Sequence, residues 1–536
     1  MPETPSNIQA IPTDEGSALR EMLKIALPAV VSMVSFSLMQ FVDRLLTARL
    51  IGPEALAAAG NGGIASWVPA SVMMGILGVI NTYVSQNLGA GKPENGPKYA
   101  WAGMWMCLVV WCLVLIPYAV FFPQVFHAMR STAGVPDVSN HVAAMETIYG
   151  RTLLLGLILT LSARSLGHYF YGMHRPWVVM ISTLSGNAVN LVVSYALIKW
   201  AYLFPELGAE GMARMAMRGT AIGTVVGAAV ECIIPLSLFL SSKYHRLYQT
   251  RSSWKPAWEP IRDLLKLGWP GGLMFGNEMV CWWIFMGGFV ASFDEGSAVA
   301  THNPAGWIVH QYLMLSFMPA VGISIAATAM VGKCMGAGRA DLAESRTWLA
   351  VKFTMTYMGL CALGFVLFGP TMARVFMPEG VPPAQADRIV YLARWMLVMA
   401  ATFQLFDGMA ITVSGALRGA GDTVWPGVAT VLFSWGFIVG GGWIAVNYLP
   451  WMSSFGPWAA ASLYIIALSI FFFWRFRSGR WKSMKVLGTS SSEASEGGQP
   501  VLAGDIGPAG VSMAPALDVP VLDGSPSMDP GDAAAR

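Results

Sequence analysis

The chain has 536 residues, of which 55% are hydrophobic and only 12% are charged. A soluble domain of this length would need far more charge to cover its surface, so the composition predicts a membrane protein. The formal net charge of +3 is too small to suggest a nucleic-acid partner, and no basic tract is present, so none is expected.

The apolar segments predict twelve membrane spans when about 20 apolar residues are taken as one crossing. The six spans of the first half cover residues 23–46, 60–86, 100–123, 147–172, 176–200 and 219–241. The six of the second half cover residues 261–290, 299–332, 347–370, 389–417, 424–447 and 455–477.

The two halves of the sequence repeat one another. LREMLKIALP at 19–28 returns as IRDLLKLGWP at 261–270, and GAGK at 89–92 returns as GAGR at 336–339. Matching glycines, Gly75 and Gly322, precede these two turns. Because each half has an even number of crossings, both halves must enter the membrane from the same side, as parallel repeats.

Basic residues concentrate in the loops on the side of the N-terminus, so the positive-inside rule predicts that both termini are cytoplasmic. The predicted parts are an N-terminal cytoplasmic tail (1–18), a first lobe (19–242), a cytoplasmic linker (243–260), a second lobe (261–482) and a C-terminal tail (483–536). The last part is dominated by Ser, Gly, Pro, Ala and Asp and is expected to be disordered.

Two acids lie deep inside predicted spans. Glu278 is about 20 Å into the seventh span, and Asp407 is about 15 Å from the cytoplasmic end of the tenth. A charge at this depth costs about 2.5 to 3.5 kcal/mol and is usually kept for a pathway, a relay or a binding site. The two acids are therefore predicted to bind a cation or a proton in exchange. The alternative is that each pairs with a basic or polar side chain and only fixes helix packing.

The helix that carries Glu278 also presents apolar side chains at three- and four-residue spacing from it. Aromatic faces attract organic cations, and methionine adapts to irregular shapes. The predicted substrate cavity is therefore lined by Met274, Phe275, Trp282 and Phe285, together with Phe403, four residues before Asp407. The alternative is that these side chains face lipid or neighbouring helices.

Other polar residues in the spans give less specific signals. Asp43 adjoins Arg44, so an interfacial ion pair and a functional acid are both open. Arg164 either extends toward the cytoplasmic turn or lines a pathway. The six cysteines and the histidines at 127, 168 and 174 lack metal-ligand spacing, so no metal and no other cofactor is expected.

Several motifs together resemble the multidrug and toxic compound extrusion family. They are the run from Leu23 to Gly60, the GAGK and GAGR turns, FPELGAEGMA at 204–213, SGALRGAGDTVWP at 414–426 and RFRSGRW at 475–481. The resemblance covers about residues 19–482. It implies an all-α integral membrane protein with twelve helices in two lobes. Such a protein would sit in the inner (plasma) membrane as a monomer and expel cationic or amphipathic compounds by letting Na⁺ or H⁺ in.

The resemblance also assigns roles to the acids. Glu278 stands eight residues after Pro270, and Asp407 stands eleven before Arg418, as the family's coupling acids do. Asp43 matches the aspartate of the family's VD pair in the first span, with Asn190, Thr224 and Asn187 as supporting polar groups.

Two departures from the family pattern weaken the case for a complete Na⁺ cage. Ser194 replaces an aspartate that some relatives carry four residues after Asn190, which removes a carboxylate. Phe403 replaces a tyrosine of some relatives, which removes a hydroxyl ligand.

Other functions are less compatible with the sequence. A flippase for lipid-linked sugars, from the same wider superfamily, is the alternative, but it would need several arginines in the inner halves of spans 1, 2, 7 and 8, and these offer almost none. An enzyme is not expected because HExxH and GxSxG motifs are lacking. GAGK and GAGR do not have the spacing of a phosphate loop, so an ion gradient rather than ATP is expected to drive transport.

Overall fold

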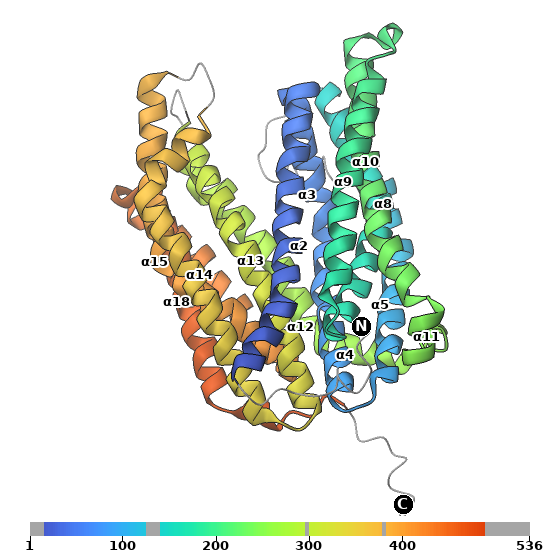
Figure 1. Cartoon of the computed structure of the whole chain (residues 1–536). Helices are drawn as coiled ribbons and strands as arrows, with labels where there is room; N and C mark the ends of the chain where they lie inside the picture. The colour runs from blue at the N-terminus through green and yellow to red at the C-terminus, as the bar shows by residue number, and fades with distance from the viewer. Residues whose placement is uncertain (1–14, 125–139, 295–299, 378–381, 488–536) are drawn as a thin grey trace, which may run out of the picture. The chain divides into compact units, whose positions relative to one another are not determined.

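The computed structural model describes residues 15–124, 140–294, 300–377 and 382–487, and all regular secondary structure in these ranges is helical (Figure 1). His127 and the predicted tail from residue 488 onward lie outside the described residues. The described part contains twelve helical segments long and apolar enough to cross a membrane, which confirms the predicted number and order of spans.

The first half supplies six of these segments. They are α2 (Glu15–Leu50); α3 (Pro53–Leu77) with α4 (Val79–Gly89); η1 (Pro93–Asn95) and α5 (Gly96–Val110) with the π-helical η2 (Trp111–Leu115) and α6 (Ile116–Val120); α8 (Asn140–Gly172); α9 (Pro176–Ala201); and η3 (Pro205–Leu207) with α10 (Gly208–Phe239). The short α11 (Ser242–Tyr248) follows; it begins at the last residue of the predicted first lobe and continues into the predicted linker.

The second half repeats this order. Its segments are α12 (Trp258–Trp283) with the π-helical η4 (Ile284–Val290) and η5 (Ala291–Asp294); α13 (His302–Gly336); α14 (Ala340–Val375); α15 (Pro383–Ala420); α16 (Val424–Phe433) with the π-helical η6 (Ser434–Gly441) and α17 (Gly442–Tyr448); and η7 (Pro450–Met452) with α18 (Phe455–Arg477) and η8 (Arg480–Ser483).

The two halves contact each other through two pairs of helices. The first helix of each half packs on the second span of the other: α2 lies against α13, as Figure 1 shows, and α12 lies against α3. Glycine permits both crossings. A Cβ added to Gly75 would overlap the backbone of Gly271, and one added to Gly322 would lie 2.8 Å from the backbone nitrogen of Val30. The matching glycines of the sequence repeat are therefore contact points between the halves.

Contact between the halves is concentrated at one end of the bundle, called here the inner end, where α2 begins and α4 and α13 end. It is the lower end in Figure 1. Every residue of α13 from Gly322 to Cys334 is buried, as is α4 from Val79 to Leu88. The other half of α13 exposes Trp307 and Leu315. The inner end is thus the closed end of the interface between the halves.

Candidate functional site

Glu278 on α12 and Asp407 on α15 lie within electrostatic range of each other. The hydroxyl of Tyr464 on α18 donates a hydrogen bond to Glu278 Oε1 at 3.3 Å. Among the described residues, no lysine, arginine or histidine lies within ion-pair distance of either carboxylate. Glu278 thus has the kind of polar partner that the packing alternative allows, whereas neither acid has a basic neighbour within ion-pair distance among the described residues.

Asn277 precedes Glu278 on α12 and joins that turn of the helix to the π-helical η6 by hydrogen bonds. Its side-chain amide donates to Ser434 Oγ at 2.7 Å, and its carbonyl oxygen accepts from the indole of Trp435 at 2.7 Å. π-helical turns are frequent at functional sites. Neither Asn277 nor Tyr464 was identified from the sequence, because a single amide or tyrosine in an apolar span gives no spacing signal.

The side chains predicted to line a cavity divide into two groups. Met274 and Trp282 are half-buried, and Phe275 is exposed. By contrast, Phe285 and Phe403 are fully buried. Phe285 packs edge-on against Trp458, with 5.3 Å between ring centroids. In this conformation only the first three therefore offer surface to a bound compound.

Asp43 on α2 is brought together with two of its predicted supporting residues. The amide of Asn190 on α9 lies 3.3 Å from Asp43 Oδ2 and 3.3 Å from Thr224 Oγ1 on α10. Arg44 points to the exposed surface, and no ion pair of Asp43 is formed within the described residues. The three elements thus hold one carboxylate in a neutral polar setting, to which the buried Ser194 adds no charge.

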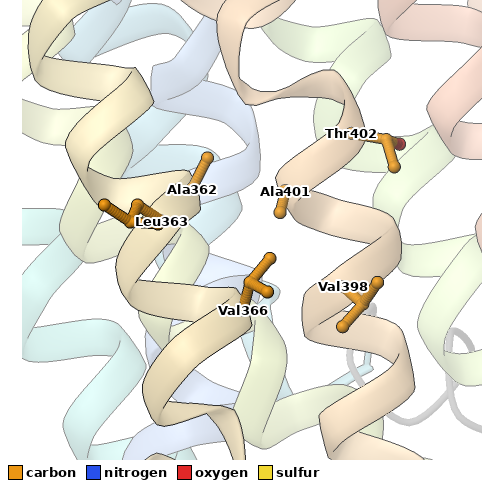
Figure 2. Close-up of a pocket in the computed structure, with 6 residues that line it drawn as sticks. All are labelled: Ala362, Leu363, Val366, Val398, Ala401 and Thr402. Carbon is orange, nitrogen blue, oxygen red and sulfur yellow. The ribbon is translucent and has the colours of Figure 1, made fainter.

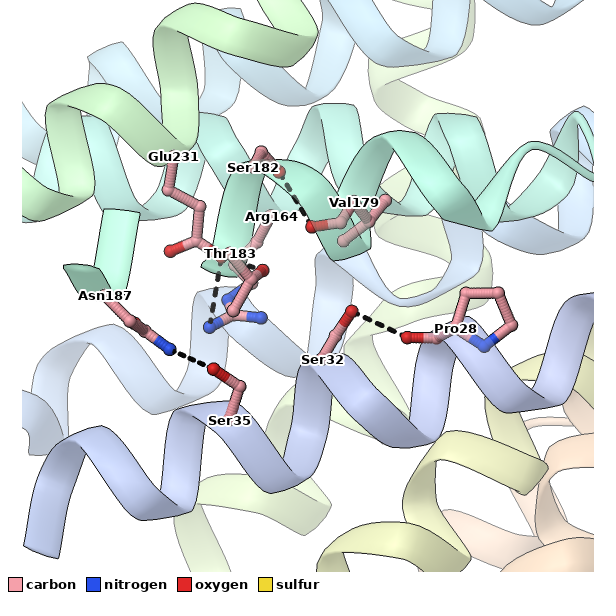
Figure 3. Close-up of polar contacts among 9 residues, drawn as sticks. All are labelled: Pro28, Ser32, Ser35, Arg164, Val179, Ser182, Thr183, Asn187 and Glu231. Carbon is pink, nitrogen blue, oxygen red and sulfur yellow. Dashed lines mark hydrogen bonds and ion pairs between the residues drawn. The ribbon is translucent and has the colours of Figure 1, made fainter. Parts of the chain in front are cut away.

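Asn187, the third predicted supporting residue, lies outside the Asp43 cluster and donates to Ser35 Oγ on α2 at 2.7 Å (Figure 3). Figure 3 also shows Arg164 on α8 directed toward Glu231 on α10. Their closest charged atoms are 3.9 Å apart. Arg164 therefore has an acidic neighbour inside the first half. Sequence reasoning missed Glu231, although an acid within the apolar run 219–241 is a recognisable signal.

A second charged cluster joins the halves at the inner end. Glu21 on α2 lies 3.1 Å from the ammonium of Lys333 on α13 and 3.5 Å from His174 Nδ1. The other ring nitrogen of His174 lies 3.2 Å from the carbonyl oxygen of Ala329, also on α13. His174 adopts a left-handed backbone conformation in the turn after α8. None of these residues was predicted to have a role.

Figure 2 shows an apolar groove between α14 and α15. It is lined by Ala362, Leu363, Val366, Val398, Ala401 and Thr402. The hydroxyl of Thr402 donates to the carbonyl of Met399 in its own helix, and no lining residue is ionisable. A groove of this composition suits contact with lipid rather than with an ion.

The MatE family model matches residues 28–196 and 277–441, which together are more than half of the chain. The chain belongs to the MatE family. This confirms the resemblance seen in the motifs, and with the twelve apolar helices it identifies a multi-pass membrane protein.

Curated relatives of this MatE protein include the "Probable multidrug resistance protein NorM" of Pseudomonas syringae pv. tomato, which is 28% identical over 87% of this chain and 95% of its own length. The "Multidrug resistance protein NorM" of Burkholderia vietnamiensis is 26% identical over 84% of this chain and 92% of its own.

Solved structures of MATE transporters share the fold. One, described as the outward-facing conformation of a multidrug resistance MATE family transporter, superposes with a TM-score of 0.75 at 18% identity over 90% of this chain. A structure described as a MOP superfamily transporter from Pyrococcus furiosus also shares the fold, with a TM-score of 0.74 at 19% identity over 88% of this chain. At this identity the similarity establishes the fold alone.

Proposed function

We propose that this MatE protein is a secondary active exporter that exchanges H⁺ or Na⁺ for cationic or amphipathic compounds. Its relatives are named for multidrug resistance, and the match covers almost their whole length. The proposal places the protein in the inner membrane with both termini in the cytoplasm, so that the inner end of the bundle faces the cytoplasm. The working unit of the proposal is a monomer, as the family resemblance implies.

The pair formed by Glu278 and Asp407 carries this proposal. Two carboxylates within electrostatic range of each other inside membrane spans, without a basic partner among the described residues, offer negative charge to an incoming ion or a cationic compound. Binding one cation at this pair weakens the attraction for a second. Exchange then becomes competitive without any covalent chemistry.

Alternating access is the second part of the proposal. Parallel repeats of this kind transport by rocking one lobe against the other around a site between them. The burial of α4 and of the inner part of α13 supports a state that is closed toward the cytoplasm. The opposite state would require the contacts of Glu21 and His174 with α13 to separate.

The test is transport of a cationic dye in proteoliposomes under an imposed pH or Na⁺ gradient. Wild type is compared with Glu278→Gln and Asp407→Asn, which remove the charges and keep the side-chain shape. Gradient-dependent transport in wild type and its loss in both variants are expected. Equal wild-type transport without any gradient would contradict antiport, and full activity of both variants would remove the acids from the mechanism.

A further inference from the structure

Glu231 is held in the interior of the first half by a close approach of two helices. A Cβ added to Gly186 on α9 would lie 2.8 Å from the carbonyl oxygen of Gly227 on α10 and 3.2 Å from the Cβ of Glu231. This contact brings the Glu231 carboxylate onto Thr183, whose hydroxyl donates to Oε1 at 2.8 Å. Glu231 is only 14% exposed, although it lies in the middle of an apolar span.

The ion pair between Glu231 and Arg164 is loose. Its separation of 3.9 Å is beyond hydrogen-bonding distance, and Nε of Arg164 is buried without a hydrogen-bond partner. The pair between Asp422 and Arg475 in the second half is a contrast, because its atoms are 2.7 Å apart and both side chains are almost completely buried. Close, hydrogen-bonded geometry is what allows a buried ion pair to offset its desolvation. The Glu231 pair lacks this geometry, so its carboxylate keeps capacity for another partner.

A line of polar residues on α9 extends from Glu231 toward Asp43. Thr183, Asn187 and Asn190 are spaced four and three residues apart, so they share one face of the helix over about 10 Å. Along that face Thr183 binds Glu231, Asn187 binds Ser35, and Asn190 binds Asp43. The first half therefore connects two acids by a polar face rather than by an apolar one.

We propose that Glu231 is a second proton-accepting acid of the first lobe, and that Arg164 is the resident cation that balances its carboxylate while no proton is bound. The inference rests on the proposed antiport function and names H⁺ as an ion that the first lobe carries. In the step, one proton binds the carboxylate and forms a carboxylic acid, and no other species is consumed. Arg164 then loses its counter-charge and keeps the ring of Phe36, which lies 5.3 Å from its guanidinium carbon.

The surroundings of Glu231 leave few other groups that would respond to pH. From α8 it faces Arg164 and the hydroxyl of Tyr171, and on its own helix Cys232 adjoins it. The buried His168 lies one turn after Arg164 on α8 and interacts with that arginine, so it is a second titratable group near the pair. From α9 and α2, the neighbouring polar groups of this face are Thr183, Asn187 and Ser35, all uncharged. A change of pH response in a Glu231 variant is therefore expected to report the carboxylate itself.

The experiment measures two quantities in the full-length protein: the dissociation constant of a cationic dye at fixed pH, and dye exchange driven by a pH gradient in proteoliposomes. Glu231→Gln is expected to slow pH-driven exchange by about tenfold or more and to change the dye dissociation constant by less than about threefold. Glu231→Asp, which keeps the carboxylate, is expected to restore most of the exchange. Glu210→Gln is the matched control, because Glu210 is an exposed acid of the same helix.

Two results for Glu231→Gln would overturn the proposal. One is pH-driven dye exchange at the wild-type rate, and the other is a loss of dye binding as large as the loss of exchange. If Glu231→Gln does not fold, the double variant Arg164→Leu with Glu231→Leu replaces the pair by apolar groups, which proteins often tolerate. If the folded double variant binds dye but shows no pH-driven dye exchange, the proposal is supported. If the double variant still shows pH-driven dye exchange, the proposal is contradicted. A wild type without any response to a pH gradient would instead refute H⁺ coupling as a whole.

Discussion

The carboxylate of Glu21 lies 3.1 Å from the ammonium of Lys333, although 312 residues separate the two in sequence. The contact joins α2 of the first half to α13 of the second. Asp263 occupies the position of Glu21 in the repeated motif of the second half. Its carboxylate accepts a hydrogen bond from Tyr99 of the first half at 3.2 Å. The two equivalent acids of the repeat therefore both make polar contacts at the inner end, with partners that are not themselves equivalent.

Loss of the Glu21 charge is expected to loosen this end. Glu21→Gln weakens the contacts with both Lys333 and His174. The equilibrium between the states closed and open at the inner end is expected to shift toward the open state by about 1 to 3 kcal/mol, or roughly 5- to 150-fold. Hydrogen exchange of α4 and of α13 from Gly322 to Cys334 measures the shift. Glu344→Gln, which breaks the more exposed pair with Lys482, is the control, and equal exchange in both variants would contradict the prediction.

The glycine crossings between the halves are expected to be intolerant of side chains. Gly75→Ala and Gly322→Ala would each place a Cβ into the backbone of the opposite half, where no flexible side chain can move away. Both variants are expected to lower the melting temperature and to increase hydrogen exchange at the inner end. Gly364→Ala on α14 is the matched control, because its Cβ would meet nothing within 4 Å. Unchanged melting of Gly75→Ala would show that the halves do not need this close approach.

The number, order and parallel repetition of the helices could be predicted because length and hydrophobicity determine a membrane span almost alone. The matching glycines were visible in the sequence too, and their role follows from the repeat. The contact of Glu278 with Tyr464 could not be predicted, because it depends on how α12 and α18 rotate against each other. Hydrophobicity alone does not set that rotation, because lipid tails are as apolar as the side chains that pack between the helices.

The first-lobe cluster was predicted only in part, and the missing part has a physical reason. Asp43 and Asn190 were identified by a family motif, and the structure brings them together. Asn187 points instead to Ser35, one helical turn away from that cluster. Glu231 and Arg164 form a pair that the motif does not contain. A motif records which residue types recur, whereas the choice of partner depends on a helix spacing that glycines at 186 and 227 determine.

Tyr464 is expected to tune the coupling acids without being essential for folding. Tyr464→Phe removes only the hydroxyl that donates to Glu278 and keeps the buried ring. A hydrogen bond to a charged group contributes about 1.5 to 3 kcal/mol, so ion-driven dye exchange is expected to slow by about tenfold or more. Tyr312→Phe is the control, because its hydroxyl binds the carbonyl of Met372 rather than an acid. If the two variants transport equally well, Tyr464 has no part in coupling.

The pair between Asp422 and Arg475 is expected to serve stability rather than transport. Asp422 is 1% and Arg475 6% exposed, their atoms are 2.7 Å apart, and the guanidinium lies over the ring of Trp425 at 5.7 Å. Asp422→Asn leaves a buried arginine without its counter-charge, which costs about 3 to 5 kcal/mol. A clear fall in melting temperature is therefore expected, whereas the ion dependence of transport by the folded fraction stays as in wild type. Asp341→Asn, in an exposed pair, is expected to leave melting unchanged. A changed ion dependence in Asp422→Asn would place this pair in the coupling machinery, since loss of a purely structural contact alters how much protein is folded and not which ion the folded protein binds.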